Sequence, residues 1–424
     1  MRPNLNINNK KKIINDPIYG FISFPKDIIF DIIEHPYFQR LRRIKQLGLS
    51  HLVYPGALHT RFHHTLGATH LMTKAILSLH QKGIEISEEE ETGVLIAVLL
   101  HDIGHGPFSH TLEYDILKNV SHEQISLLFM KRLNEAFNNE LKLGIQIFED
   151  KYPKPFLHQL VSSQLDMDRM DYLNRDSFYT GVSEGVIGSD RIISMLDVVD
   201  NNLVVEQKGV YSIEKFLVAR RLMYWQVYMH KTVVSSEVML ACILRRAKQL
   251  VQANVEVFAS PTFTYFLKND FLFSDLESNS EILEQFALLD DYDIMGAVKV
   301  WQFHEDKVLS LLAKKLINRK LFKNEISNQP FDEKRIQYEI DHVKKDFDFN
   351  QEEASHFVHT AILRNNAYNE EKENINLLMK DGSIKDVSLA ADNLNIHALS
   401  KPVEKYYLCY LIKNRSNKDA IVKN

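Results

Sequence analysis

The spacing of hydrophobic residues predicts helices over most of the first 255 positions. Apolar side chains there recur every three or four residues, which is the period of one buried helix face. The segments with this spacing are 66–82, 89–101, 122–137, 155–178 and 212–255. Asp27 to Gln46 also reads as helical, and Pro36 begins a second segment within it. The stretch "KIINDPIYGFISFP" (12–25) differs, because β-prone residues flank a Pro/Gly turn, and it predicts a hairpin.

The pattern changes beyond about residue 260. The stretch up to about residue 275 is aromatic and irregular, and helices are expected at 281–287, 291–302 and 304–318. Residues 374–391 alternate around Asp381-Gly382, which is typical of a hairpin turn, and 406–412 read as a further strand. We therefore predict a mainly α chain in two regions. Residues 1–260 would form a hairpin and a helical core, and residues 261–424 a smaller α+β region.

The composition narrows the class of protein. The chain has 424 residues and 45% hydrophobic content, which is enough for a large core. Its net charge of −5 provides no overall basic field that would recruit nucleic acid. Cys242 and Cys409 cannot form a disulfide framework, which fits a reducing compartment. Because the N-terminus is polar and no run approaches about 20 apolar residues, we expect a cytoplasmic protein without a membrane span.

A cluster of titratable residues follows one wholly apolar segment. Residues 94–100 are apolar, and "LLHDIGHGPFSH" (99–110) then places His101 and Asp102 just before the glycines and proline that end the helix. Successive side chains on a helix point about 100° apart, so this pair could share an ion only at such a helix end. Histidine and aspartate together suit a borderline or hard divalent cation.

Further metal donors lie elsewhere in the chain. The stretch "TRFHHTLGATH" (60–70) offers His63 and His64 at the start of a helix. Any one histidine is more often a hydrogen-bonded structural residue than a ligand, so the residues alone leave the choice of ligands open. The ordered set of histidine, then His-Asp, then aspartate is what favours a metal centre. The stretch "DMDRMDYLNRD" (166–176) offers the aspartates, which are Asp166, Asp168, Asp171 and Asp176.

Five stretches carry a family resemblance: "INDPIYGFISF", "FQRLRRIKQLGLSHLVYPGALHTRFHHTLG", "LLHDIGHGPFSHTLE", "LDMDRMDYLNRD" and "YMHKTV". They resemble the HD-domain phosphohydrolases. More narrowly, they resemble the deoxynucleoside triphosphate (dNTP) triphosphohydrolases of the sterile-alpha-motif/HD type and their bacterial relatives, without a segment like the sterile-alpha-motif domain. The likeness spans roughly residues 10–255 and implies an HD-domain helical core.

The resemblance implies four metal ligands, through the family patterns Arg-Phe-x-His and Asp-x-Asp-[Lys/Arg]. His63 would then be a bystander, and Asp166 and Asp171 would cap or pair within their helix. A set of histidine and aspartate accepts iron, manganese, nickel, zinc or magnesium. A second magnesium ion could accompany the triphosphate. The implied ligands are His64, His101, Asp102 and Asp168.

The resemblance also agrees with a candidate pair for proton transfer. His110 and Glu113 are spaced i, i+3, so their side chains face each other on a helix. A carboxylate that orients an imidazole suits a general acid for the departing 5′ oxygen. The family has aspartate where Glu113 stands. His105 and His122 match further active-site histidines, with roles in substrate contact or water positioning.

Substrate-binding residues are implied in the same way. Tyr172 and Asp176 follow Asp168 at i+4 and i+8, on one helical stripe that also contains Arg175, and would contact the sugar. Crowding near C2′ would exclude ribose, although core packing is the alternative for the tyrosines and a solvated helix face for the cations. Gln46 and Leu47 would approach the 3′ and 2′ sides of the sugar, with Tyr228 packed against it. The polyphosphate would contact Arg61, Arg169, Arg220 and Lys231.

A second nucleotide site is implied, because better-studied members of the family bind a guanine nucleotide between subunits. We therefore expect a homo-oligomer, either a dimer or a tetramer, which a guanine nucleotide could activate. The alternative is that the helical residues of this set only stabilise their helix. The matching residues are Lys12, Glu34, Gln39 and Arg42, although the family has aspartate where Glu34 stands.

The expected function is that of a metal-dependent dNTP triphosphohydrolase. For this enzyme, dGTP is a candidate for the preferred substrate or for an activator. One alternative is another HD phosphohydrolase that acts on nucleoside monophosphates or signalling nucleotides. Another is a vestigial site in a module that senses nucleotides or binds nucleic acid through the basic runs 10–12, 245–246 and 314–323. Those runs lack regular aromatic interleaving, so stacking on single strands is not indicated.

Overall fold

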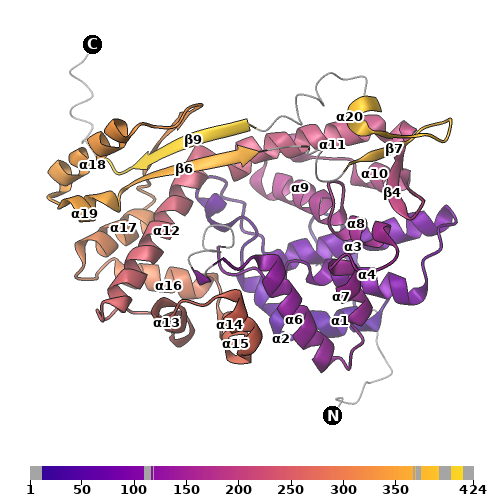
Figure 1. Ribbon diagram of the computed structural model, residues 1–424, viewed down its shortest axis with the longest axis horizontal. Coiled ribbons are helices and arrows are strands. Elements are labelled where there is room, and N and C mark those ends of the chain that lie inside the picture. The colour runs from indigo at the N-terminus through magenta and orange to yellow at the C-terminus, as the bar shows by residue number, and fades with distance from the viewer. Residues whose placement is uncertain are drawn as a thin grey trace. The chain divides into compact units, whose positions relative to one another are not determined.

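The computed structural model describes residues 12–108, 116–117, 119–365, 368, 374–390 and 403–413 (Figure 1). Its contacts divide the chain into two compact units. The first unit contains Met1–Val227, Phe271–Asp291 and Asn366–Pro402. The second contains Tyr228–Asp270, Tyr292–Asn365 and Val403–Asn424. Each unit draws on separate stretches of sequence, and the domain boundary near residue 260 stays a prediction.

The first unit begins with the expected hairpin. β1 (Ile14–Asp16) and β2 (Gly20–Ile22) pair antiparallel. The Asp16 carboxylate accepts the backbone N–H groups of Ile18 and Tyr19 at 2.9 and 3.0 Å, an arrangement that closes the turn between the strands.

Three helices form the core of the first unit. α3 (Arg61–Gln81) packs against both α4 (Glu88–Leu100) and α9 (Met167–Thr180) (Figure 1). The apolar residues that end α4 are all buried, as expected for a helix without a polar face. Gly67 permits the close approach of α9 to α3, because a Cβ at this position would lie 2.0 Å from Oδ1 of Asp171.

Other elements complete the first unit. Its sheet has the order β3-β4-β7-β8, in which β4 and β7 are parallel and the other two pairs are antiparallel. β7 and β8 turn at Asp381-Gly382, as the sequence predicts. The strands are β3 (Leu196–Val199), β4 (Asn202–Glu206), β7 (Asn376–Leu378) and β8 (Ile384–Asp386). The further helices are α1 (Asp27–Glu34), α2 (Pro36–Gln39), α6 (His122–Ala136), α7 (Lys142–Phe148), α8 (Pro155–Val161), α10 (Ser189–Met195), α11 (Val210–Met223), α14 (Phe273–Ser278), α15 (Ser280–Leu288) and α20 (Val387–Ala390).

Two expected helices are divided in the structure. The helix expected over 155–178 is α8 followed by α9, because Asp166 accepts the backbone N–H groups of Ser163 and Arg169 and caps a new helix. The helix expected over 212–255 is α11, a π-helical turn (Tyr224–Tyr228) and then α12 (Lys231–Gln252). Hydrophobic spacing misses both breaks, because apolar residues flank each one at helical intervals.

The second unit combines helices with one sheet. α12 packs against α13 (Pro261–Lys268) and α17 (Lys307–Ile317). The sheet has the order β5-β9-β6 with antiparallel neighbours, and β6 and β9 lie side by side along their whole length (Figure 1). The strands are β5 (Lys323–Ser327), β6 (Val358–Asn365) and β9 (Val403–Tyr410). The remaining helices are α16 (Asp291–Trp301), α18 (Glu333–Phe347) and α19 (Gln351–Ser355).

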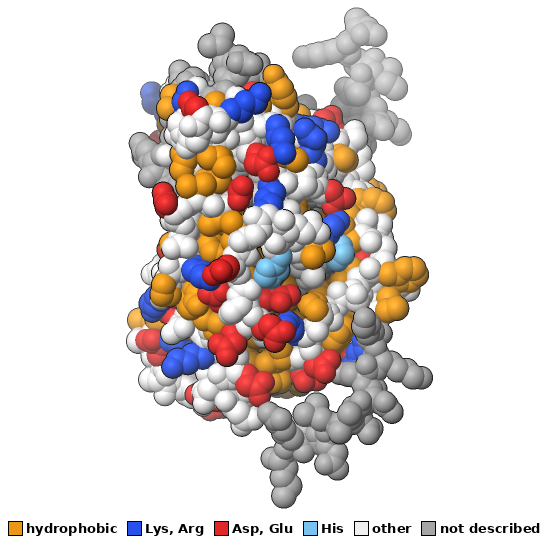
Figure 2. Space-filling view, turned by 90° about the vertical axis from the view of Figure 1, so that its right-hand side faces the viewer, with side chains coloured by type: hydrophobic (Ala, Val, Ile, Leu, Met, Phe, Trp, Pro, Cys, Tyr) orange, Lys and Arg blue, Asp and Glu red, His pale blue; other side chains and the backbone are white. Residues whose placement is uncertain are grey.

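Helices dominate the described residues and the sheets are small, which confirms the mainly α class with a smaller α+β region. α13 and α14 lie where the sequence predicts irregular structure. On the face shown in Figure 2, acidic and basic side chains are mixed with uncharged ones. Within the described ranges, no single helix has the length and apolar content needed to cross a membrane.

Candidate active site

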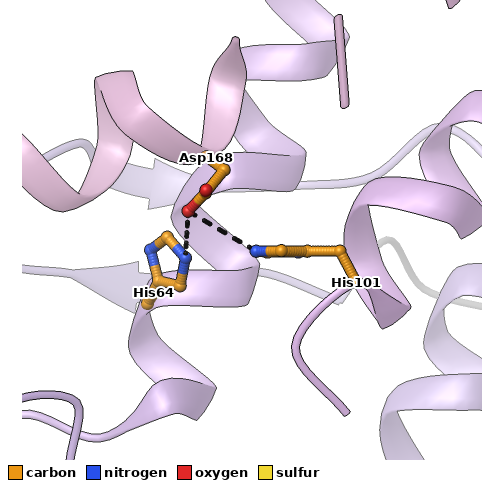
Figure 3. Close-up of side chains that lie close together, drawn as sticks. All are labelled: His64, His101 and Asp168. Atoms are coloured by element: carbon orange, nitrogen blue, oxygen red, sulfur yellow. Dashed lines mark ion pairs between the residues drawn. The ribbon is translucent and has the colours of Figure 1, made fainter. Parts of the chain in front are cut away.

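Three of the implied metal ligands converge in the first unit. His64 lies in the first turns of α3, His101 directly follows α4, and Asp168 lies in the first turn of α9 (Figure 3). Oδ1 of Asp168 is 3.0 Å from Nε2 of His64 and 3.5 Å from Nε2 of His101. These three donor atoms lie within 4.8 Å of one another, so the group could hold a metal ion.

The two histidines present unpartnered nitrogens to this point. Nε2 of His64 and Nε2 of His101 are buried and have no hydrogen-bond partner in the described part of the chain. Nδ1–H of His101 donates to the carbonyl of Val98 at 2.6 Å, and Nδ1–H of His64 donates to Asp171 at 2.8 Å. Each bond leaves the Nε2 lone pair for a metal, which is how proteins orient metal-binding imidazoles. The donor set therefore fits a divalent cation.

A buried chain of charges supports His64. Nε and one terminal nitrogen of Arg175 donate to the two oxygens of Asp171, each at 2.9 Å. The other terminal nitrogen donates to Asp16 in the hairpin at 2.8 Å. Arg175 and Asp171 are fully buried. Arg175 thus contacts the carboxylate that orients His64, although the helical stripe predicts that Arg175 shares a face with Asp168.

Asp102 lies between the metal group and two further residues. Its Oδ1 is 3.4 Å from Nε2 of His101 and 3.2 Å from Nε2 of His105. Its Oδ2 is 3.8 Å from Nε2 of His64 and accepts a hydrogen bond from Arg61 at 2.5 Å. Arg61 therefore contacts a candidate metal ligand directly, a contact that spacing along the chain does not predict.

The supporting histidines also lie near this centre. Asp102, His105 and His122 form a second group that could hold a metal ion, and the rings of His105 and His122 stack with centroids 3.9 Å apart. Burial and the nearby Arg61 guanidinium hold the pKa of His105 well below its usual range. His110 and Glu113 lie outside the described residues.

The carboxylates give the metal group a negative field. Burial acts to lower the pKa of His64, but the neighbouring Asp168 and Asp171 carboxylates raise that pKa to about 10. Burial likewise acts to raise the pKa of Asp168, and the two histidines hold it below its usual value. This negative field favours a positive charge at this point, whether it is carried by the imidazoles or by a bound cation.

The candidate phosphate contacts have different environments. Arg169 pairs with Asp166 one turn away, and Asp166 also caps α9. Arg220 in α11 is buried, and its Nε and one terminal nitrogen have no hydrogen-bond partner in the described ranges. Both guanidiniums act electrostatically on Tyr172, whose pKa burial raises. Tyr228 and Lys231 belong to the second unit, so their roles stay predictions.

Two contacts of the residues implied to bind the sugar are not predicted by the sequence. Oδ1 of Asp176 is 2.8 Å from Nε2 of His59, which is fully buried. The backbone N–H of Gln46 donates to the carbonyl of His59 at 3.0 Å, and Leu47 follows Gln46 in the chain. Sequence analysis misses His59 because its partner on α9 is 117 positions away, and no local spacing signals such a contact.

Residues far from the motifs also hold the turn after α4. Two nitrogens of Arg40 donate to the carbonyl of His105, each at 2.8 Å, and burial lowers the pKa of Arg40 to about 9. The Asp291 carboxylate accepts the backbone N–H groups of Phe108 at 3.1 Å and Lys45 at 3.0 Å. Both anchors are separated from their partners by long stretches of sequence, so the sequence does not predict them.

The residues of the implied second site lie in two pairs beside the end of α1. Nζ of Lys12 is 3.3 Å from a Glu34 carboxylate oxygen. Nε of Arg42 donates to the Gln39 side-chain carbonyl at 2.8 Å, and the Gln39 amide donates to the carbonyl of Ile33, next to Glu34, at 2.7 Å. Whether they bind a nucleotide stays a prediction.

Comparisons with known proteins identify the family of this chain. The family model for the HD domain matches residues 61–176, and the model for the HD associated region matches residues 187–260. The crystal structure of a phosphohydrolase from Bacteroides thetaiotaomicron has 56% sequence identity and a TM-score of 0.92, and the match covers 95% of this chain and 100% of that chain. The chain is a member of the HD-domain phosphohydrolases.

Two further relatives are similar to this HD-domain phosphohydrolase. The uncharacterized protein YwfO of Bacillus subtilis is 31% identical over 394 residues, which cover 90% of this chain and 88% of that protein. The deoxynucleoside triphosphate triphosphohydrolase SAMHD1 homolog of Dictyostelium discoideum is 36% identical over 260 residues, 57% of this chain and 50% of that protein. The match to the HD domain begins at Arg61 and ends at Asp176, so it includes every candidate metal ligand.

Proposed function

We propose that this HD-domain phosphohydrolase is a metal-dependent dNTP triphosphohydrolase that releases a deoxynucleoside and triphosphate. The observation that carries the proposal is one group of side chains in the first unit. Unpartnered imidazole nitrogens of His64 and His101 face Asp168, and Asp176 follows two turns along the same helix. The likeness to the Dictyostelium triphosphohydrolase homolog supports the choice of substrate.

The proposed reaction is a displacement at the α-phosphorus. An oxygen from water forms a bond to that phosphorus, and the bond from phosphorus to the 5′ oxygen breaks. A divalent cation held by His64, His101, Asp102 and Asp168 would lower the pKa of a bound water toward neutrality. Histidine and aspartate ligands admit iron, manganese, nickel, zinc or magnesium, and magnesium could also accompany the triphosphate.

The chain's own residues would supply the remaining requirements. Arg61, Arg169 and Arg220 would neutralise the polyphosphate, since guanidinium groups bind phosphate oxygens through several hydrogen bonds. The family resemblance implies Lys231 as a further phosphate contact. The 5′ oxygen must gain a proton as it leaves, and we assign that proton to His110, oriented by Glu113. His105 and His122 would contact the substrate or position the attacking water.

The sugar side of the site would select deoxynucleotides. Asp176 and Tyr172 on α9 would contact the sugar, with Gln46 toward its 3′ side and Leu47 toward its 2′ side. A side chain placed against C2′ leaves no room for a 2′-hydroxyl group. Tyr228 would pack against the same ring. Deoxynucleotides are therefore the proposed substrates, and ribonucleotides would be excluded.

Product analysis tests this proposal. The metal-loaded protein is incubated with the four dNTPs and, separately, with the four NTPs, and phosphate products are separated by ion-exchange chromatography. We expect triphosphate from dNTPs alone. Orthophosphate or pyrophosphate would instead indicate another HD phosphohydrolase reaction, and the absence of any product would favour a sensing role. The His101→Ala variant is the matched control for a contaminating phosphatase.

A guanine-nucleotide activator is a second candidate function of the same chain. The adjoining pairs Lys12–Glu34 and Gln39–Arg42 favour it, because they gather two cations and two acceptors beside α1. We propose that GTP or dGTP bound there promotes a dimer or tetramer. Turnover of dATP and the oligomeric state are measured with and without GTP, in the wild type and in Arg42→Ala. Equal rates of dATP turnover and an equal molecular mass of the oligomer with and without GTP would rule out activation by a guanine nucleotide.

A further inference from the structure

His59 occupies an unusual position between two segments of the candidate site. Its side chain is fully buried, and Nε2 is 2.8 Å from Oδ1 of Asp176. Its ring stacks on Tyr179, with centroids 4.4 Å apart and planes 19° apart. The stack and the carboxylate contact together leave the ring one orientation. Because Nε2 faces a carboxylate, which can only accept, Nε2 carries the proton and donates a hydrogen bond to Asp176.

The backbone of His59 reaches the second segment. Its carbonyl accepts the N–H of Gln46 at 3.0 Å, and the neighbouring residues Lys45 and Thr60 form an antiparallel bridge. The strand-like segment that carries Gln46 is thereby fixed to the residue that fixes Asp176. Oε1 of Gln46 is buried, and among the described residues it has no hydrogen-bond partner. An acceptor of this kind points to a ligand hydroxyl or amide group.

We propose that His59 is a positioning residue that sets Asp176 and Gln46 at a fixed separation to bind the 3′-hydroxyl of the nucleotide sugar. The inference rests on the proposed function in one respect, that these two residues contact the sugar. His59 itself touches no substrate atom. It acts by holding one carboxylate oxygen of Asp176, so that the carboxylate cannot turn away from the sugar.

Sugar discrimination provides a test that a loss of stability alone would not mimic. The kcat/KM values for a dNTP and for the matching 2′,3′-dideoxynucleotide are measured on the same preparation, so their ratio does not depend on the fraction of active protein. His59→Phe keeps an aromatic ring against Tyr179 but removes the donor. We expect the ratio to fall roughly tenfold, the value of one lost hydrogen bond to a charged group.

A rescue variant and a control separate the donor from the packing. His59→Gln restores an N–H group near the position of Nε2, and we expect it to recover most of the lost ratio. His63→Phe changes a neighbouring half-buried histidine whose Nδ1 contacts Thr60 and whose ring lies edge-on to the same Tyr179. We expect that variant to keep the wild-type ratio. If His59→Phe yields no folded protein, His59→Asn replaces it, because its shorter amide falls short of Asp176.

The possible results are distinct. If the wild type turns over dNTPs and His59→Phe keeps the wild-type ratio, the role of His59 is wrong and the proposed function stands. If the ratio falls in His59→Phe and stays low in His59→Gln, the donor is not the cause and the inference is also wrong. If the wild type releases no triphosphate from any dNTP, the proposed function and this inference fall together.

Discussion

Histidine at position 101 combines two properties that suit a metal ligand. It is the first residue after a buried helix, and a backbone carbonyl fixes its Nδ1, so its Nε2 is held toward Asp168. Its side chain is only 11% exposed, but it lies beyond the apolar residues that form the packed end of α4. Its role is therefore local to the metal.

We expect His101→Ala to lose bound metal and turnover while the fold remains. Metal content is measured by mass spectrometry of the purified protein, turnover by triphosphate release, and folding by circular dichroism. His80→Ala, at the end of α3, is the matched control and should keep both metal and turnover. A His101→Ala protein with full metal content and full activity would refute the ligand assignment.

A second prediction concerns the buried carboxylate of Asp171. It accepts from both His64 and Arg175 in a fully buried setting, so Asp171→Asn disturbs the imidazole and leaves Arg175, among the described residues, with Asp16 as its one carboxylate partner. We expect metal affinity to fall about 10- to 100-fold and the free energy of unfolding to fall by about 3 kcal/mol. Metal titration and urea denaturation measure the two effects.

The control for Asp171 is an exposed ion pair on the same unit. Asp190 pairs with Lys74 near the surface, and Asp190→Asn should change neither metal affinity nor stability measurably. If Asp171→Asn binds metal with the wild-type affinity, the hydrogen bond from Nδ1 of His64 to Asp171 does not orient the imidazole.

At the scale of elements, α4 must begin and end at fixed points for His101 to reach the metal. Its start is fixed by Glu90, which accepts the backbone N–H of Ser87 at 2.8 Å and the side chains of Lys154 and Tyr152 at 2.8 and 2.7 Å. Burial acts to raise the pKa of Glu90, but these hydrogen bonds, led by that of Lys154, lower it below its usual value.

This pKa shift predicts a pH dependence of stability. Because the pKa of Glu90 is lower in the folded than in the unfolded state, its stabilisation is complete above the unfolded pKa of about 4.3 and is lost as pH falls through the folded pKa. We expect Glu90→Gln to lower the free energy of unfolding by about 1–2 kcal/mol at neutral pH. The difference from the wild type should shrink below about pH 4, as urea titrations would show. An equal difference at both pH values would contradict the assignment.

The elements also show how far local sequence pattern can predict this protein. The hairpin, the buried α4 and the strands β7, β8 and β9 follow from alternation and helical spacing, because those signals arise within a few residues. The strands β3, β4, β5 and β6 are not predicted by the sequence pattern. The break before α9 depends on one capping contact of Asp166, and the π-helical turn at Tyr224–Tyr228 has no hydrophobic signature. Family resemblance rather than spacing selects His64 over His63. The contacts of Arg40, His59 and Asp291 join distant segments, so no local pattern contains them.

At the scale of the whole molecule, a bound metal should stabilise the fold. His64 and Asp168 lie on α3 and α9 and His101 directly follows α4, so an ion that they hold would link these three core helices. A ligand that binds only the folded state at 100 times its dissociation constant adds about 2.7 kcal/mol to stability. Chelation followed by thermal melting should lower the midpoint, and added metal should restore it. His101→Ala should show a much smaller change.

The central claim is attack at the α-phosphorus, and hydrolysis in ¹⁸O-labelled water tests it most directly. The metal-loaded wild type is incubated with each dNTP in labelled water, with and without GTP, and the products are weighed by mass spectrometry. The account predicts one ¹⁸O atom in the triphosphate and none in the deoxynucleoside. Label in the deoxynucleoside, or label in orthophosphate or pyrophosphate with no triphosphate present, would contradict it.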